Sequence, residues 1–475
     1  MKTTYQTLFF LSFFFPLITL LPLNAYASGL LLPDRLLRSD LLWLNERGVI
    51  RTGLMTWPLS KSEVVRALKH ARPIHSSEKM ALERVLNRIN KEMTITAYAR
   101  KKMTHKLPEF AGNHYAREGM TITSFSEGEN WTLRLNGNIE SRKHIENTTR
   151  FNLHSSYGAV QIFDQSVSFG QIPKWWGPGQ DGSLILSDAS RPVTGFSMQR
   201  TLTNPPETEF LKWTGPWQYQ LSFGQLSQYK SVPEAMLMGA RIIFSPANTF
   251  DIGFSRVIQW GGKGRPFSWG TFWEAVAGKD NTGTVNEPGN QLAGIDFKIR
   301  LEPLTGRPLS FYGQIVGEDE AGYLPSANMF LAGLEGHLNF SNKALSWYLE
   351  AYDTRTNFGR KNYSYRHHIY QDGYYHQGFP LGAALGGDAQ LLTAGIEWVI
   401  NDELRWKLRG SHAKVNPTNQ KINKAYPEKD TLKSLQIDVN YEANFTYGFN
   451  LAAWFTNSKA KSDDIGVGLT LLFSL

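Results

Sequence analysis

Apolar and polar residues alternate along several segments of the chain after residue 92. In 131-WTLRLNGNIESR-142, Trp131, Leu133 and Leu135 occupy alternate positions, with polar or charged residues between them. The same alternation recurs in 217–224, 295–302, 404–410 and 435–442. Because successive side chains of a strand point to opposite faces, the pattern predicts antiparallel strands with one apolar and one polar face.

Two folds produce this alternation: a soluble antiparallel sheet packed on a core, and a transmembrane β-barrel with lipid outside and water inside. Three features favour the barrel. The alternating segments run to about ten residues, whereas strands of soluble proteins usually have about 5–6. Aromatic residues gather at segment ends, and short connections alternate with longer ones, as in bacterial outer-membrane barrels.

We therefore expect an all-β transmembrane barrel of about 18 antiparallel strands. The last segment alternates to the final residue, so we expect it to pair with the first strand and leave no unpaired edge in the bilayer. Such a barrel encloses an aqueous bore unless the helices or the long loops fill it. The expected strands are 93–101, 118–126, 130–142, 150–162, 166–173, 207–214, 217–226, 235–244, 250–260, 290–302, 308–316, 328–340, 345–353, 389–400, 404–415, 433–443, 447–457 and 464–475.

Residues 28–92 carry a helical pattern and are expected to form a small periplasmic bundle ahead of a barrel over 93–475. Ser39 and Asp40 are expected to cap one helix, and 60-SKSE-63 is a capping box for the next. Three connections within the barrel are very long and are expected to be extracellular. They lie near 174–206, 261–289 and 354–388.

The N-terminus has the order of a secretory signal peptide: Lys2, an apolar run over 8–23, and then 25-AYA-27. We expect cleavage after Ala27, which removes a signal peptide of residues 1–27; the alternative is an N-terminal membrane anchor. No later apolar run has the length of a transmembrane helix. The chain contains no cysteine, so burial and hydrogen bonding have to stabilise it without disulfides.

Candidate chemistry gathers in the long connections, which combine aromatic rings with basic residues. Aromatic faces suit the C–H groups of sugar rings, and basic neighbours suit an acidic polysaccharide. The alternative is that the rings belong to an interfacial girdle or pack loop against loop inside the mouth. The candidate carbohydrate-binding residues are Trp175, Trp176, Arg191, Trp269, Trp273, Tyr363, Tyr365, Tyr374 and Tyr375.

Catalytic and metal sites find little support in the sequence. The run 318-EDE-320 is a candidate carboxylate pair, but acidic residues are common in external loops. Adjacent histidines on an exposed loop are weak signals of metal binding; the residues concerned are His367, His368, Asp372 and His376. No G-x-S-x-G, P-loop or H-E-x-x-H motif occurs. We predict no catalytic residues, no metal and no cofactor.

Long stretches of the chain resemble the Wzi capsule assembly proteins. The stretches are 40-DLLWLNERGVI-50, 56-TWPLS-60, 169-FGQIPKWWGPG-179, 280-DNTGTVNEPGNQLAG-294, 317-GEDEAGYLPSANMFL-331 and 363-YSYRHHIYQDGYYHQGFPLG-382. The resemblance implies an eighteen-stranded outer-membrane barrel with an N-terminal helical bundle at its periplasmic end. It further implies a lectin-like, non-enzymatic role in holding capsular polysaccharide at the surface of Gram-negative bacteria.

We therefore expect a protein that binds acidic capsular polysaccharide and attaches the capsule to the cell surface, with outer-membrane lipid around its wall. The N-terminal helices are candidates to contact periplasmic or capsule export components, and no nucleic acid partner is expected. Two alternatives stay open. One is an outer-membrane porin or sugar channel, and the other is an outer-membrane enzyme that acts on glycan or lipid.

Overall fold

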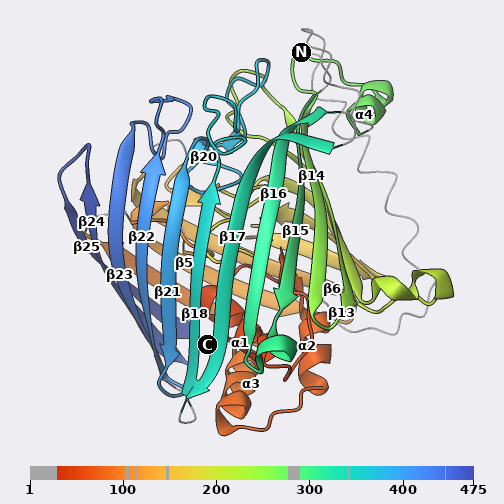
Figure 1. Cartoon of the computed structure of the whole chain (residues 1–475), viewed down its shortest axis with the longest axis vertical. Coiled ribbons are helices and arrows are strands. Elements are labelled where there is room, and N and C mark those ends of the chain that lie inside the picture. Colours follow the sequence, from red (N-terminus) through yellow and green to blue (C-terminus); the bar gives the residue numbers. More distant parts are fainter. Residues whose placement is uncertain are drawn as a thin grey trace.

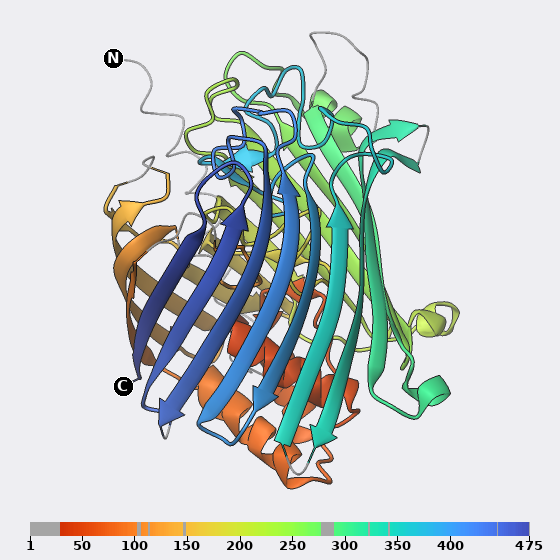
Figure 2. The ribbon, with the colours of Figure 1, turned by 60° about the vertical axis from the view of Figure 1, so that its left-hand side comes forward.

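The chain forms a closed antiparallel β-barrel with a group of helices at one end (Figures 1 and 2). The structure is a computed structural model. It describes residues 29–101, 106–112, 115–145, 149–276, 289–321, 324–340, 343–443 and 445–474. The expected signal peptide, 1–27, lies outside the described residues.

The barrel wall has eighteen strands when β7 and β8, which both pair with β6, count as one interrupted strand. The last strand pairs with the first, β25 with β4, so the wall closes as the sequence predicts. The wall strands are β4 (Met93–Arg100), β5 (Ala116–Glu127), β6 (Trp131–Lys143), β7 (Phe151–Asn152), β8 (Tyr157–Ile162), β9 (Gln165–Gln171), β11 (Thr194–Arg200), β12 (Trp217–Gln225), β13 (Met236–Ala247), β14 (Phe250–Trp260), β15 (Gly289–Arg300), β16 (Leu309–Ala321), β17 (Leu324–Phe340), β18 (Lys343–Asp353), β21 (Gln390–Val399), β22 (Leu404–Val415), β23 (Asp430–Ala443), β24 (Tyr447–Ser458) and β25 (Asp464–Ser474).

Short elements lie inside the barrel and at its two ends. Helices α1 to α3 lie at one end, here called the helix end, and most long connections leave the opposite end, here called the loop end (Figure 1). None of the helices in the described part of the chain has the length and apolar character needed to cross a membrane. The short elements are β1 (Leu30–Leu31), α1 (Arg35–Glu46), β2 (Thr56–Trp57), β3 (Leu59–Ser60), α2 (Lys61–Lys69), α3 (Ser76–Ile89), β10 (Trp175–Trp176), the 3-10 helix η1 (Glu209–Thr214), α4 (Trp269–Val276), α5 (Glu302–Thr305), β19 (Tyr375–His376) and β20 (Phe379–Pro380).

The helix starts follow local capping chemistry, with one correction. The Ser60 side chain accepts from Glu63 N–H at the start of α2, as the capping box predicts. The first helix starts earlier than expected, and Asp34 caps it by accepting from Leu37 N–H at 2.9 Å. Asp40 therefore lies within α1, where its carboxylate is free to face another part of the molecule.

The wall has the predicted division between an apolar outer face and a polar inner face. In β23, Leu435 and Ile437 are exposed on the outside, whereas the intervening Gln436 and Asp438 are only 2% exposed. The alternation places hydrocarbon-compatible side chains against lipid and hydrogen-bonding side chains in the interior.

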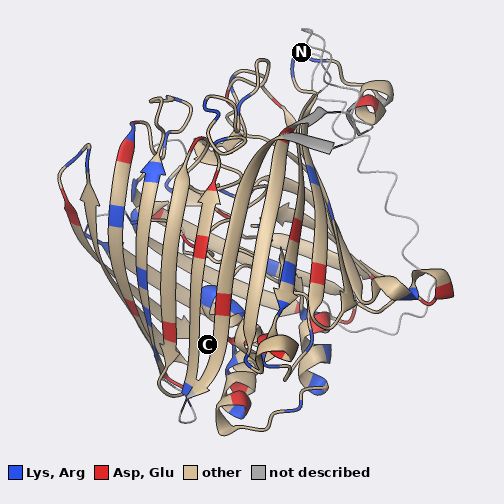
Figure 3. Ribbon diagram, in the orientation of Figure 1, with Lys and Arg blue, Asp and Glu red and all other residues tan. Residues whose placement is uncertain are grey.

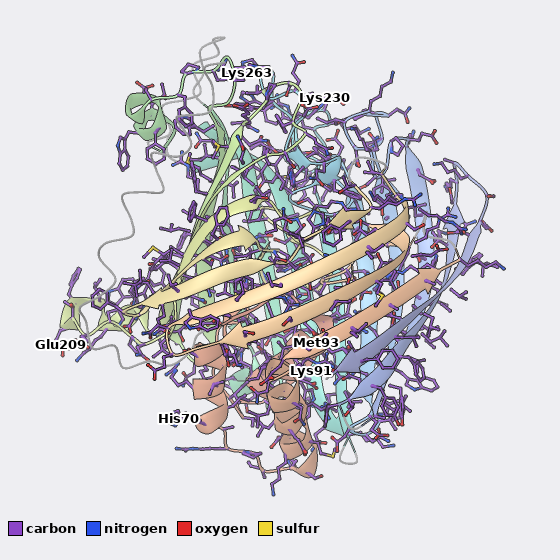
Figure 4. All side chains as sticks on the ribbon, turned by 180° about the vertical axis from the view of Figure 1, so that it is seen from behind. His70, Lys91, Met93, Glu209, Lys230 and Lys263 are labelled. Carbon is purple, nitrogen blue, oxygen red and sulfur yellow. The ribbon has the colours of Figure 1, made fainter. Side chains whose placement is uncertain are left out.

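One predicted strand is wrong. Residues 207–214 do not form a strand, because Glu209–Thr214 is η1, and the corresponding wall strand is β11, Thr194–Arg200. The physical reason is 204-NPPETEFLKWTGP-216, whose prolines lack the N–H groups that a ladder needs. Figure 4 shows Glu209 beyond the barrel wall, and Phe210 and Trp213 of η1 are 82% and 70% exposed.

The division of the wall predicts a depth-dependent cost for a charge on its outer face. Replacing Ile437→Arg, near the middle of β23, should destabilise the folded barrel by roughly 2–4 kcal/mol, and Thr431→Arg, near the strand end, by about 1 kcal/mol or less. The measurement is chemical unfolding in lipid vesicles. Equal costs at the two positions would contradict this placement of the bilayer.

Candidate functional site

The bore of the barrel is filled by three parts of the chain, here together called the plug. These are helices α1 to α3, the connection 172–193 (the inner loop), and the connection 361–389 (the tyrosine loop). Two clusters of buried side chains join these parts to one another and to the wall. The plug confirms that the helices and two of the three long connections fill the bore, whereas the third connection, near 261–289, does not contribute to the plug in its described part.

Buried ion pairs fix the helices to the wall. Asp40 of α1 meets Arg405 of β22 at 2.8 Å and Arg84 of α3 at 2.8 Å. Burial by itself would raise the pKa of Asp40, but the two arginines outweigh it and lower the pKa to about 2. Asp40 is 3% exposed, so this carboxylate joins two helices and one wall strand out of solvent contact.

A second group of ion pairs lies at the end of α1. Glu46 meets Lys298 at 2.8 Å and Arg300 at 3.3 Å, both from β15. Lys298 also contacts Glu335 of β17. Charged residues inside this barrel therefore pair with the plug as well as across the wall.

The tandem tryptophans of the inner loop are buried rather than exposed. Trp175 is 2% exposed, pairs in β10 with Trp57 of β2, and packs edge-on against Phe110 at 5.1 Å. Trp176 is fully buried and donates from its indole nitrogen to Gln220 Oε1 at 2.5 Å. Both rings therefore form part of the plug.

The glycines around these tryptophans permit close approach. A Cβ atom added at Gly179 would lie 2.1 Å from the carbonyl oxygen of Gly182. Arg38 of α1 donates to the carbonyl oxygens of Pro178 at 3.1 Å and Gly179 at 2.7 Å. The Gly-Pro-Gly sequence thus lets the inner loop turn tightly against the helices.

Buried carboxylate and phenol groups hold the rest of the inner loop. Glu350 of β18 accepts from the backbone N–H groups of Gln180 at 2.6 Å and Asp181 at 3.0 Å. Tyr365 and Tyr374 donate their hydroxyl groups to the carbonyl oxygens of Leu184 and Ile185, at 2.5 and 2.7 Å. These tyrosines are supports for the inner loop.

Arg191 and Tyr375 are also internal. Arg191 is fully buried, forms a two-point contact with Glu140 at 2.7 and 3.1 Å, and lies over the Tyr115 ring at 4.5 Å. Tyr375 is 4% exposed, and its hydroxyl accepts from Gly387 N–H at 3.2 Å.

Six of the nine candidate sugar-binding residues are buried, so the structure supports the alternative of loop packing inside the barrel over exposure on an outer loop. A ring with no exposed surface has no face to offer a sugar in this conformation. The reason is that their loops turn into the bore, where apolar area is removed from water. The six are Trp175, Trp176, Arg191, Tyr365, Tyr374 and Tyr375.

The remaining three candidates belong to the loop end. Trp273 of α4 is 61% exposed. Tyr363 is partly exposed, and the guanidinium of Arg360 lies 4.0 Å from its ring centroid. Trp269 is the first residue of α4, but its side chain lies outside the described part of the structure. Sugar contact by these three stays a prediction.

Other exposed aromatic rings at the loop end are rigidly supported. Phe267, 63% exposed, stacks on Trp260 with ring centroids 4.4 Å apart. Phe358, 67% exposed, stacks on Phe330 at 4.1 Å with nearly parallel rings. Phe358 is not among the candidates from the sequence. Its position next to 354-TRT-356, in a basic and polar loop, was the feature from which its exposure could have been predicted.

The loop end is strongly basic (Figure 3). Figure 4 places Lys230 and Lys263 at this end, opposite His70 at the helix end. The described loops carry twelve exposed Lys and Arg residues but only four exposed acidic residues, so the surface attracts anions. The basic residues are Lys101, Arg150, Lys230, Lys263, Arg360, Lys361, Arg366, Lys421, Lys424, Lys429, Lys459 and Lys461; the acidic residues are Glu234, Glu274, Glu428 and Asp463.

The residues that the sequence offered as metal ligands or as a carboxylate pair form hydrogen bonds within the protein instead. Asp372 accepts from the N–H groups of Lys230 and Ser231, both at 2.6 Å. His376 contacts the Ser227 hydroxyl at 2.9 Å, and Glu318 accepts from Tyr365 N–H. Among the described residues, no group of three or more metal-ligand side chains is arranged around a common point.

Comparisons with known proteins agree on one family. The sequence model of the capsule assembly protein Wzi matches residues 90–467. A Klebsiella pneumoniae protein, described as an uncharacterized 55.8 kDa protein in the cps region, is 50% identical over 465 residues, covering 97% of this chain and 92% of that protein. The chain belongs to the Wzi capsule assembly family.

A solved structure supports the fold as well as the family. It is described as Wzi, an outer-membrane protein involved in group 1 capsule assembly in Escherichia coli and a carbohydrate-binding β-barrel. It matches with a TM-score of 0.89 and 47% identity, covering 94% of this chain and 99% of that one. This Wzi-family chain is thus an outer-membrane barrel, as the sequence predicts.

The ion pairs of Asp40 predict an acid-sensitive plug. The pKa of Asp40 in the folded protein, about 2, lies below the ordinary value of 3.8 for an aspartate in an unfolded chain. The carboxylate therefore stabilises the folded state above about pH 4. That contribution, about 2 kcal/mol, is lost as the pH falls toward 2. The free energy of unfolding is measured in detergent for wild type and Asp40→Asn. Between pH 4 and pH 2 it should fall less in the variant than in wild type. Identical acid profiles would contradict this role.

Buried and exposed tryptophans should respond differently to truncation. Trp176→Ala leaves a void in the plug and should destabilise the protein by about 3–5 kcal/mol. Trp273→Ala removes a surface ring and should change stability by about 0.5 kcal/mol or less. The measurement is the free energy of unfolding by urea for each variant. A comparable loss in the two variants would show that Trp176 is not a packing residue.

Proposed function

We propose that this protein binds acidic capsular polysaccharide at its loop end and thereby attaches the capsule to the outer surface of the cell. The observation that carries the proposal is the combination of a filled bore with a basic, aromatic loop end. The family model matches capsule assembly proteins, and the related solved structure is described as carbohydrate-binding, which supports the same ligand class.

The loop end suits a charged sugar polymer in two ways. Its twelve exposed basic side chains attract carboxylates over a range of about 10 Å at 0.1 M salt. Trp273, Phe267 and Tyr363 supply ring surface beside those charges. The structure thus offers many weak contacts along a surface, which fits a repetitive polymer better than a single small ligand.

The proposal includes an orientation and a mode of action. The loop end faces the cell exterior and the helix end faces the periplasm, where the exposed faces of α2 and α3 are available to capsule export components, while lipid surrounds the wall. The protein acts by binding, without catalysis. The plug argues against a porin or sugar channel, because α1, the inner loop and the tyrosine loop occupy the bore.

The charge of the loop end should set both affinity and capsule retention. The triple variant Lys361→Glu, Arg366→Glu, Lys421→Glu should bind purified acidic capsular polysaccharide with an association rate reduced at least about tenfold at low salt, because electrostatic attraction is lost. The same variant should leave more polysaccharide in the medium and less on cells, with total synthesis unchanged. Biolayer interferometry and fractionation of cell cultures measure the two effects.

A matched control is available at the helix end. Lys79 of α3 is exposed and distant from the loops, so Lys79→Glu should leave polysaccharide binding and retention as in wild type. If the loop-end triple variant binds and retains polysaccharide as well as wild type does, the proposed function is wrong. If purified protein releases shorter products from the polymer, the non-catalytic mode of action is wrong.

A further inference from the structure

A cleft of about 1050 Å³ opens at the helix end, on the opposite side of the molecule from the proposed capsule-binding surface. Its walls are residues 45–53 at the end of α1, the end of α2, and the turns and strand ends of the wall around β12 to β15. Figure 4 shows His70, one of the lining residues, at this end of the protein. A volume of this size accommodates a small ligand or a short segment of a polymer.

Cationic side chains outnumber acidic ones in the lining of the cleft. Its lining includes five arginines, Arg47, Arg51, Arg66, Arg72 and Arg300, and three acidic residues, Glu46, Asp251 and Glu302. The guanidinium group is suited to two-point contact with a planar carboxylate. The composition therefore favours a carboxylated ligand.

Three of the arginines already have carboxylate partners. Arg47 meets Glu78 at 2.9 Å, Arg66 meets Glu63 at 2.6 Å, and Arg300 meets Asp251 at 2.7 Å. These pairs hold the walls in place and leave little net charge of their own. They are scaffold rather than ligand sites.

Arg51 and Arg72 differ from the other three. Neither has a carboxylate within 4.0 Å among the described residues. Arg51 donates to the carbonyl oxygens of Ala247, at 3.0 Å, and Asn248, which fixes its position on a wall turn. Burial and the nearby charge of Arg300 lower the pKa of Arg51, and the more distant carboxylates of Asp251 and Glu46 offset this only in part.

The uncharged part of the lining suits a sugar. Trp217 and four prolines (Pro205, Pro216, Pro303 and Pro308) form apolar rims, and Gln218, Asn248 and Thr249 supply hydrogen-bonding groups. Apolar walls with a few polar groups are typical of small-ligand sites.

We infer that this cleft is a second binding site, which takes a short segment of a uronic-acid-containing oligosaccharide, with Arg51 and Arg72 contacting its carboxylates. The choice of a glycan rests on the proposed function, whereas the anionic character of the ligand follows from the cleft itself. The protein then contacts acidic glycan at both ends, separately, because the plug lies between them.

Local reporters can separate the two sites, because the chain has no cysteine of its own. Ala247→Cys, exposed next to the cleft rim, and Gln371→Cys, exposed at the loop end, each receive an environment-sensitive fluorophore in the full-length protein in nanodiscs. Each is titrated with a tetrasaccharide of uronic acid and with its carboxyl-reduced, neutral counterpart. We expect the rim reporter to respond to the acidic sugar with a half-saturating concentration at least about tenfold lower than for the neutral sugar.

The contacts are tested by variants in the reporter background. Arg51→Gln with Arg72→Gln should raise the half-saturating concentration at the rim reporter at least about tenfold. Arg72→Gln alone keeps the wall contacts of Arg51 and should raise the half-saturating concentration by a smaller factor. This single variant keeps the test valid if the double variant does not fold. The loop-end control Lys230→Gln with Lys263→Gln removes the same charge and should leave the rim response unchanged.

The outcomes distinguish this inference from the proposed function. No response of the rim reporter, an equal response to acidic and neutral sugars, or insensitivity to both Arg variants would overturn the cleft as a glycan site. A silent loop-end reporter together with unchanged capsule retention in the loop-end triple variant would instead overturn the proposed function, whatever the rim reporter shows.

Discussion

Charged groups that face the interior of a lipid-enclosed wall need partners inside the barrel, and this requirement organises the structure. An unpaired buried charge costs several kcal/mol, so many of the inward cations have a carboxylate beside them. For Arg241 the partner is Asp296 of the wall, but for Arg405 it is Asp40 of a helix and for Arg409 it is Asp181 of the inner loop. Wall and plug therefore complete each other's ion pairs.

Most of the wall could be predicted because a lipid-facing strand leaves a period-two pattern that depends only on neighbouring residues. The expected strand 250–260 coincides with β14, and 404–415 coincides with β22. The misplaced strand shows the limit of the pattern. In β11, Phe196 and Met198 alternate over only a few residues, whereas the apolar residues Phe210, Leu211 and Trp213 lie in a proline-bounded segment outside the sheet.

The candidate site was harder to predict, because the direction taken by a loop depends on contacts with distant residues. Trp176 lies inside because Gln220 accepts a hydrogen bond from its indole N–H and Gln314 donates one to its carbonyl oxygen. The residues next to Trp176 in the sequence give no sign of these distant partners. The apolar run 184-LIL-186 was the best local sign that the inner loop turns inward. Charge was the better guide to the surface for Lys263 and Lys361, which are exposed, but not for Arg191 of the inner loop, which is fully buried.

The filled bore bears on how the polymer reaches its binding surface. Opening a passage would require α1 and the inner loop to leave together, and each broken buried ion pair would cost about 3–5 kcal/mol. On the proposed function, the polysaccharide therefore comes to this protein from outside, after secretion through a separate conduit. The protein therefore holds finished polysaccharide chains at the cell surface and is not the channel through which they are exported.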